Sequence, residues 1–397
     1  MTDGRLKFGA FMAPYHFPPT NPTLALERDL QLVEAMDRLG FDEVFLGEHH
    51  SGGVEIVPAP EMFLAAAAQR TSRIRLGTGV TSIPYHHPLL VADRMLFLDH
   101  LSRGRAIFGV GPGALVGDAH MMGIDPSTQR TRLEEGFEAV WRLLNTDEPV
   151  TMETEWFTLR NGRTNLRPLQ GPRLESVVAA TRSPSGPRLA GRFGSGLLSL
   201  AATDPSGGFA FLEETWQIME ERAAEFGQTV DRSDWRLVTL MHVARTEKEA
   251  RAQVRDRLAN MLRIGATGPF APVAEKDVEE VLRERDIDDI IDERNASGSL
   301  VIGTPAMACE QIERLVKQTG GFGSLLLMVH DIATAEDIQN SMALLAEQVV
   351  PEFTGQLTRP SEEWDKLFDA RRSASTEFRN AQDKAIAEYA AERARRA

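Results

Sequence analysis

Three adjacent residues that can handle protons, Glu48, His49 and His50, follow a short apolar run. An imidazole beside a carboxylate can accept or deliver a proton near neutral pH, and it can also bind a metal ion. Neighbouring residues of an extended strand point to opposite faces, so His49 and His50 cannot easily hold one ion together. His86 and His87 could complete a metal site, and a merely hydrogen-bonded histidine is a third alternative. We favour proton handling and expect no metal.

A second segment, Phe108–Gly113, places glycine at alternate positions. The missing side chains would let a flat ligand lie close to the backbone, although a tight turn would need glycine equally. The spacing to the next glycines, Gly117 and Gly123, does not fit the dinucleotide-binding pattern GxGxxG. This segment therefore predicts a close approach of the backbone rather than a nucleotide loop.

A third segment, Arg182–Pro187, combines serine, glycine and proline at the start of a predicted short helix. Free backbone amides at a helix N-terminus bind anions, and the charge of Arg182 could help. Ordinary capping of the helix by Ser183 or Ser185 is the alternative.

Each segment follows a run of apolar residues typical of a strand buried on both faces. Eight runs are predicted to be strands: Leu6–Met12, Glu43–Gly47, Ile74–Val80, Ala106–Val110, Ser176–Thr181, Gly196–Leu200, Arg236–Ala244 and Ser324–Val329. Amphipathic patterns between them predict helices, such as Leu24–Leu39 before Gly40 and Pro305–Gln318 after Thr304.

The alternation of strands and helices predicts an α/β fold with a parallel sheet and right-handed crossovers. About eight such units predict a closed (β/α)8 barrel of the TIM type, and an open doubly wound sheet is the alternative. Residues at the C-terminal strand ends surround the active site of such a barrel. Glu48 and the two histidines after it would therefore lie at its mouth.

Two insertions and a tail depart from this alternation. Residues 151–172 predict a small hairpin around Asn161-Gly162, a turn dipeptide. Residues 246–300, with a Gly- and Pro-rich centre at Gly265–Pro272, form either a lid over the barrel or a surface excursion. We predict one barrel domain over residues 1–355 and a helical extension over residues 356–397, which is either solvated or in contact with a partner.

Composition narrows the functional classes. The chain has 397 residues, 42% hydrophobic and 26% charged, which is ordinary for a globular protein. Its net charge of −14 disfavours binding to nucleic acid. A single cysteine, Cys309, excludes disulfides and thiolate metal sites within one chain. No apolar stretch is long enough for a membrane span, and the N-terminus does not read as a signal peptide, so we expect a cytoplasmic protein.

Taken together, the motifs resemble the bacterial luciferase-like flavin-dependent monooxygenase family. The matching stretches are KFGAFMAPYHF (7–17), FDEVFLGEHH (41–50), RIRLGTGVTSIPYHHPLLVADRMLFLDHLSRGR (73–105), FGVGPGALVGDAHMMGID (108–125), ATRSPSGPRLAGRFGSGLLS (180–199) and LVIGTPAMACEQIERL (300–315). They run over about residues 5–350 in the family's order. EHHSGG, YHHP and GVGPG are most similar to the limonene 1,2-monooxygenase-like branch.

The resemblance implies a barrel that binds reduced FMN at its C-terminal mouth and receives it from a separate NAD(P)H:flavin reductase. Oxygen would add at flavin C4a, and the resulting peroxyflavin would pass one oxygen atom to a small apolar or cyclic substrate. In this family the histidine near the flavin falls on His49, which would stabilise or protonate the peroxide. Glu48 would orient His49, and His50 would lie behind it. Such a site must be dry, and the 246–300 insertion is long enough to close it.

The family's phosphate site falls on Ser183 and the amides through Gly186, next to Ser185, and Arg182 is the candidate cation. The stretch Gly111–Gly113 would pass beside the isoalloxazine.

Luciferase itself carries a Cys-Arg pair where this chain has Gly111-Pro112, so light emission is not expected. The family often has a non-proline cis peptide under the flavin, and Gly79-Val80 would be its position.

The candidate pocket residues are Phe11, Tyr15, Tyr85, His86 and Met121. For Phe11, barrel core is the alternative. Three other functions stay open: an F420-dependent oxidoreductase of the same superfamily, a non-catalytic flavin-binding protein, and a metal-dependent hydrolase. A proton relay at His49 argues against the second. As partners we expect a small organic substrate, O2, a flavin reductase and a second copy of the chain.

Overall fold

The computed structural model describes residues 5–13, 15–169, 171–181, 183–200, 202–203, 211–267, 285–329 and 331–396. The chain forms two compact units, Met1–Val350 and Pro351–Ala397. The boundary expected at residue 355 lies a few residues beyond this division.

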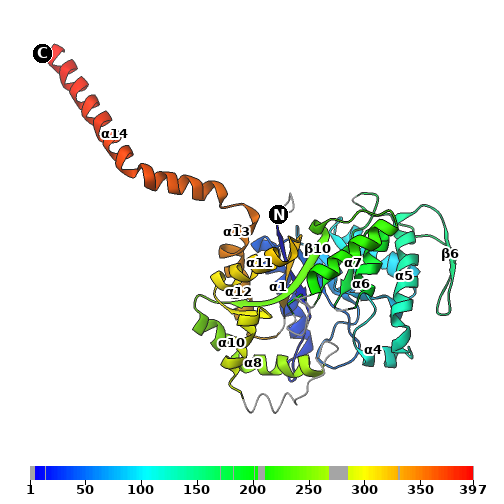
Figure 1. Cartoon of the computed structure of the whole chain (residues 1–397). Coiled ribbons are helices and arrows are strands. Elements are labelled where there is room, and N and C mark those ends of the chain that lie inside the picture. The colour runs from blue at the N-terminus through cyan, green and yellow to red at the C-terminus, as the bar shows by residue number, and fades with distance from the viewer. Residues whose placement is uncertain are drawn as a thin grey trace. The chain divides into compact units, whose positions relative to one another are not determined.

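The first unit is a closed parallel barrel (Figure 1), as the alternation of strands and helices predicts. Its strands follow one another around the barrel in chain order, and β10 closes it by pairing with both β9 and β12. These strands are β1 (Lys7–Met12), β2 (Glu43–Leu46), β3 (Arg75–Thr78), β5 (Ala106–Gly111), β8 (Ser176–Ala180), β9 (Gly196–Ser199), β10 (Trp235–Val243) and β12 (Ser324–Val329). The predicted (β/α)8 barrel is confirmed, and the open doubly wound sheet is excluded.

The helices cover the outside of the barrel (Figure 1). They are α1 (Pro22–Leu39), α2 (Pro60–Arg70), α3 (Pro88–Leu101), α4 (Val116–Met121), α5 (Gln129–Asn145), α6 (Ser185–Phe193), α7 (Leu212–Glu225), α8 (Glu247–Thr267), α10 (Ile287–Ser297), α11 (Pro305–Thr319) and α12 (Ala335–Gln348). The predicted helix signals are confirmed: α1 ends at Gly40 in the left-handed region, and Thr304 caps α11 ahead of Pro305. In the described residues no helix combines the length and the apolar character needed to cross a bilayer.

The register of the early strands brings their C-terminal ends level. Met12 pairs with Leu46, and Leu46 pairs with Thr78. The residues directly after β2, beginning with Gly47, therefore lie beside the segment that follows β3. That segment continues into the short strand β4 (Thr81–Ser82), which pairs with β5, and the turn of helix at Ile83–Tyr85.

Two expectations about secondary structure are wrong in detail. The hairpin exists as β6 (Val150–Glu153) and β7 (Thr158–Gly162), but its turn does not lie at Asn161-Gly162, which ends β7. Thr154 sets the turn instead, because its hydroxyl accepts hydrogen bonds from the amides of Trp156 and Phe157. A further strand, β11 (Leu300–Gly303), pairs with the second half of β10 and lies where only an insertion was expected.

The 246–300 insertion is built onto the barrel in its described parts. Helices α8 and α10 share a buried cluster with β10 and β11, which includes Val254, Leu258, Ile291 and Ile302. Residues 268–284, which contain much of the Gly- and Pro-rich centre, lie outside the described residues. A lid role for the insertion stays a prediction.

The N-terminal end of the barrel is closed by buried charges. Arg236 on β10 donates two hydrogen bonds of 2.9 Å to the carboxylate of Glu43 and one of 2.5 Å to Glu175. Arg75 also donates to Glu175. The guanidinium of Arg236 lies over the ring of Phe45, at 5.5 Å from its centroid. This network joins β2, β3 and β10 to the residue directly before β8, at the end opposite the mouth.

Glu175 gives this network a pH dependence that can be measured. Burial raises the pKa of Glu175, but Arg236 and Arg75 outweigh it and lower the pKa from 4.5 to about 2. The stabilisation is therefore complete above pH 4.5 and is lost as pH falls towards 2. We expect Glu175→Gln to lower the free energy of unfolding by about 2 kcal/mol at neutral pH, with the deficit shrinking in acid.

Denaturant unfolding between pH 2.5 and 7 measures this difference. The matched control is Glu138→Gln, because Glu138 is about equally exposed but contacts a single arginine, Arg192, where Glu175 contacts two. A Glu175→Gln deficit that stays constant with pH would contradict the assignment.

Candidate active site

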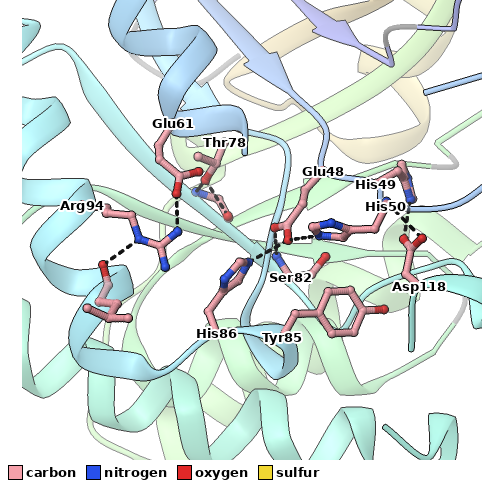
Figure 2. A network of polar contacts seen from close by, with 12 residues as sticks. Glu48, His49, His50, Glu61, Thr78, Ser82, Tyr85, His86, Arg94 and Asp118 are labelled. Carbon is pink, nitrogen blue, oxygen red and sulfur yellow. Dashed lines mark hydrogen bonds and ion pairs between the residues drawn. The ribbon is translucent and has the colours of Figure 1, made fainter. Parts of the chain in front are cut away.

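His49 lies just past β2, between two carboxylates. Its Nδ1 is 3.0 Å from Oδ2 of Asp118, and its Nε2 is 3.5 Å from Oε2 of Glu55. Asp118 comes from α4 and is almost fully buried. Its second oxygen accepts a hydrogen bond from the His50 amide at 3.0 Å (Figure 2). The same oxygen accepts a hydrogen bond from the Ser51 hydroxyl at 2.6 Å. Asp118 thus fixes both the His49 ring and the backbone that carries it.

The second carboxylate, Glu55, is held by Tyr15. The two residues form an isolated antiparallel bridge, and the Tyr15 hydroxyl hydrogen-bonds the Glu55 carboxyl. Burial of Glu55 raises its pKa, and nearby His49 and Tyr15 only partly oppose this. Burial likewise raises the pKa of Tyr15, so it stays protonated. Tyr15, Glu55, His49 and Asp118 therefore form a continuous polar chain at the mouth.

The pKa of Asp118 is shifted in the opposite direction from that of Glu55. Burial alone would raise its pKa, but hydrogen bonds from Ser51, His49 and the His50 amide lower it below its usual range. An ionised Asp118 accepts the proton of His49 Nδ1, which leaves Nε2 as the ring atom that can take up or release a proton. This arrangement suits a histidine that handles protons.

Glu48 does not orient His49, contrary to the expectation from sequence. Its carboxylate is buried, and Oε1 accepts from Nε2 of His50 at 2.9 Å and of His86 at 2.7 Å. Oε2 accepts the Ser82 amide at 2.7 Å. Figure 2 shows Glu48 turned towards His86 and Ser82, with His49 and Asp118 on the other side of His50. Alternation along the extended backbone puts the side chains of Glu48 and His50 on one side and His49 on the other.

Glu48 therefore positions the segment after β3. The Gly79-Val80 peptide in this segment is cis, as the resemblance implies. His86, expected as a donor in the pocket, is engaged by Glu48 instead. Burial would raise the pKa of Glu48, but the hydrogen bonds from His50 and His86 outweigh it and keep the pKa low.

Tyr85 closes another side of the site. Its hydroxyl accepts a 2.9 Å hydrogen bond from Gln129, which also donates to the Pro112 carbonyl at 2.8 Å. Its ring packs edge-on against His50, with centroids 6.0 Å apart. Burial raises the pKa of Tyr85 to about 12. Gly113 must be glycine here, because it has a φ of 85° and a Cβ would strike the Tyr85 hydroxyl.

The alternate glycines after β5 have a structural reason. A Cβ on Gly109 would strike the Thr78 carbonyl, and one on Gly111 would come within 2.7 Å of Val80 Cγ2. These glycines let β5 approach the segment that carries the cis peptide. A flavin contact for Gly111, Pro112 and Gly113 stays a prediction.

The predicted phosphate site lies at the start of α6, directly after β8. The hydroxyls of Ser183 and Ser185 are 2.9 Å apart, and the Ser185 amide approaches Ser183 Oγ at 3.3 Å. Gly186 is buried, and a Cβ there would meet the Ala179 carbonyl at 2.5 Å. Arg182 lies outside the described residues.

Two of the predicted pocket residues, Tyr15 and Phe11, lie at the apolar interior of the barrel. Tyr15 is partly buried and packs against this interior, as do Val80, Leu200 and Met328, which the sequence did not single out as pocket residues. Phe11, by contrast, is a member of the buried cluster itself, as the core alternative states.

Met121, also predicted for the pocket, lies away from this interior. It is 70% exposed on α4, because the buried face of that short helix carries Asp118 and Ala119. In the described residues no three histidine, cysteine or acidic side chains are placed to hold a metal.

Sequence reasoning missed Asp118 and Glu55. Asp118 falls within the matched stretch 108–125, but a single acidic residue beyond a glycine loop carries no spacing signal. Glu55 follows the glycine pair Gly52-Gly53, whose positive φ angles turn the chain back so that Glu55 meets Tyr15. A local pattern does not reveal such a return.

A (β/α)8 barrel with a histidine held by a carboxylate at its C-terminal mouth is an arrangement typical of barrel enzymes. Comparisons with known proteins identify the family. The sequence model of the luciferase-like monooxygenase family matches residues 6–321. The chain belongs to this family, and the predicted membership is confirmed. Limonene 1,2-monooxygenase from Rhodococcus erythropolis is 50% identical over 99% of both chains, which supports the predicted branch.

Other relatives agree on the class. The 4-hydroxyprotoasukamycin monooxygenase from Streptomyces nodosus subsp. asukaensis is 41% identical over 89% of this chain and 94% of its own length. The crystal structure of monooxygenase RslO1 from Streptomyces bottropensis superposes with a TM-score of 0.73 at 26% identity, over 88% of this chain and all of that one. An F420-dependent glucose-6-phosphate dehydrogenase from Beutenbergia cavernae also matches, at 31% identity over 82% of this chain and 93% of its own length, so membership does not fix the cofactor.

The contact between Glu48 and His50 predicts a measurable change in the titration of His50. The hydrogen bond with Glu48 raises the pKa of His50 above 6.5. We expect Glu48→Gln to lower the pKa of His50 towards 6.5, because the neutral amide no longer favours the imidazolium. NMR of labelled histidine rings measures this value. Gln129→Ala, which disturbs Tyr85 without removing a charge, is the control, and an unchanged His50 titration in Glu48→Gln would contradict the contact.

Proposed function

We propose that this chain is the oxygenase of a two-component monooxygenase, which uses reduced FMN and O2 to insert one oxygen atom into a small apolar or cyclic substrate. The observation that carries the proposal is the pairing of His49 with the buried, ionised Asp118 at the barrel mouth. A protein that only stored flavin would need no such proton-handling pair.

The residues at the mouth fit FMN. The start of α6 offers amides and the hydroxyls of Ser183 and Ser185, which suit a phosphate group. The partly buried side chains of Val80, Leu200 and Met328 offer an apolar surface that suits a ring system. When bound, reduced FMN would supply the electrons that activate O2 for transfer to the substrate.

The chain's own residues would control protons and water. His49 Nε2 would hold or deliver the proton, while Asp118 keeps Nδ1 protonated and the ring fixed. Glu55 is placed to exchange a proton with Nε2, since its raised pKa lets it carry one. Glu48 would keep the segment around the cis peptide in place through Ser82. The apolar surface at the mouth would limit the access of water.

The substrate class is inferred from the relatives and the mouth. Relatives named for limonene and for 4-hydroxyprotoasukamycin suggest a compound with a reactive ring or alkene. The aromatic and aliphatic side chains of Tyr15, Val80 and Met328 are consistent with an apolar substrate. We infer a separate NAD(P)H:flavin reductase, a homodimer and a cytoplasmic location, as expected from sequence.

A screen with isotopic oxygen tests this function. The purified chain is mixed with a flavin reductase, NADH, FMN, 18O2 and a panel of small cyclic alkenes and ketones that includes limonene. We expect one product to gain a single 18O atom only when FMN is reduced. Hydride exchange between F420 and an alcohol, without oxygen incorporation, would overturn the proposal in favour of an F420-dependent oxidoreductase.

The His49–Asp118 pair makes a second prediction. We expect His49→Ala and Asp118→Asn each to lower turnover by roughly 10²- to 10⁴-fold, and the double variant to lose little more, because the two residues act as a unit. Binding of FMN, followed by its fluorescence, should change little. The control is His87→Ala, which removes a nearby histidine outside the network. Full turnover in His49→Ala would remove His49 from its assigned role.

A further inference from the structure

The second unit consists mainly of one long, solvent-exposed helix. α13 (Val350–Thr354) leads to α14 (Thr358–Arg396), which at 39 residues is about 58 Å long. Five large apolar side chains on α14 are 59–67% exposed: Trp364, Leu367, Phe378, Ile386 and Tyr389. Exposed apolar groups gathered in this way mark an interaction surface more often than a solvated face.

These five side chains share one face of the helix. At 100° per residue they fall within an arc of roughly 100°. Two series of residues repeat every eleven positions along this face. One is Leu367, Phe378 and Tyr389, and the other is Trp364, Ser375 and Ile386. An eleven-residue repeat keeps a stripe nearly parallel to the helix axis, so the face stays continuous along its length.

The stripe is also symmetric about its own centre. Trp364 and Tyr389, Leu367 and Ile386, and Ser375 and Phe378 are each centred on the point between residues 376 and 377. Two such helices that pair antiparallel about a two-fold axis would place Trp364 opposite Tyr389 and Leu367 opposite Ile386. A two-fold interface requires this kind of self-complementary pattern.

The charges of α14 favour the same orientation. The last turn of α14 is basic, with Arg393, Arg395 and Arg396, and its first turn has no acidic residue. An antiparallel pair keeps the two basic last turns apart, whereas a parallel pair would set them side by side. The helix dipoles also oppose each other only in the antiparallel pair.

We propose that α14 is an association helix, which pairs antiparallel with α14 of a second copy of this chain. The pairing would cover ten large side chains and bury on the order of 1,000 Å², which is about the minimum for a biological interface. The helix lies outside the barrel unit Met1–Val350. The solved relative RslO1 covers 88% of this chain, which is about the share that the barrel unit makes up. The proposal does not depend on the proposed function.

Cysteine crosslinking on the full-length protein tests both the contact and its direction. Cys309 is replaced by serine throughout, and one protein then carries Leu367→Cys while another carries Ile386→Cys. We expect a short bis-maleimide to crosslink the mixture of the two at least tenfold more than either protein alone. The matched control is the pair Lys366→Cys and Ala387→Cys, which has the same centre but lies on the opposite face of α14 and should not crosslink.

Each other outcome overturns the proposal. Crosslinking of each protein with itself, with no higher yield in the mixture, would indicate a parallel pair. Absence of any crosslink above the control, in protein whose helix content by circular dichroism matches the parent, would indicate no pairing. Co-sedimentation of that protein with phosphatidylglycerol vesicles would then assign the stripe to a lipid surface.

A charge substitution gives an independent readout. We expect Phe378→Asp, added to the crosslinking pair, to lower the yield from the mixture at least tenfold, because it buries a carboxylate beside its symmetry mate. Arg379→Asp, the neighbouring position outside the stripe, should leave the yield within about twofold of the parent. Equal yields in all three proteins would show that the stripe does not form the contact.

Discussion

The ionised carboxylate of Asp118 is the group on which the candidate site depends. A carboxylate that is 1% exposed loses its hydration, and this is tolerable only when several donors replace the lost water. Those donors are Ser51, the His50 amide and the His49 ring. One of the bonds that offset the burial therefore also fixes the tautomer and the angle of His49. Local stability and the placement of His49 Nε2 rest on the same contact, because turning the ring away would take the His49 donor from Oδ2 of the buried Asp118 carboxylate.

The pKa values of the two carboxylates beside His49 are shifted in opposite directions, so the two nitrogens of the ring face different partners. Asp118 is kept charged by its donors, whereas burial favours the protonated form of Glu55. Pairs of acids that differ in this way commonly divide the roles of fixed charge and proton carrier. Here Nδ1 faces the fixed charge and Nε2 faces the carrier. Protons would then move on the Glu55 side of the ring only.

The sequence predicts the barrel well because buried parallel strands leave a strong local pattern, and the strand before Glu48 is an example. It predicts His49 at the mouth for the same reason. It does not predict the partner of His49, because Asp118 is 69 residues away and its contact depends on how α4 packs. The adjacency of Glu48 and His49 is misleading, since side chains alternate along an extended backbone. The prediction of the hairpin turn at Asn161-Gly162 is wrong for a similar reason, because the hydroxyl of Thr154 stabilises a turn elsewhere.

The two units of the chain differ in how their apolar side chains are packed. Those of the barrel strands are buried in the barrel, whereas those of α14 are exposed. The described groups of the candidate site all lie in the barrel unit. A long helix with a stripe of aromatic and aliphatic side chains in water is a liability for a lone protein, because it favours non-specific association. A stripe with its own two-fold symmetry limits that risk, since one defined pairing buries the whole of it. Association can then change without altering the residues around His49.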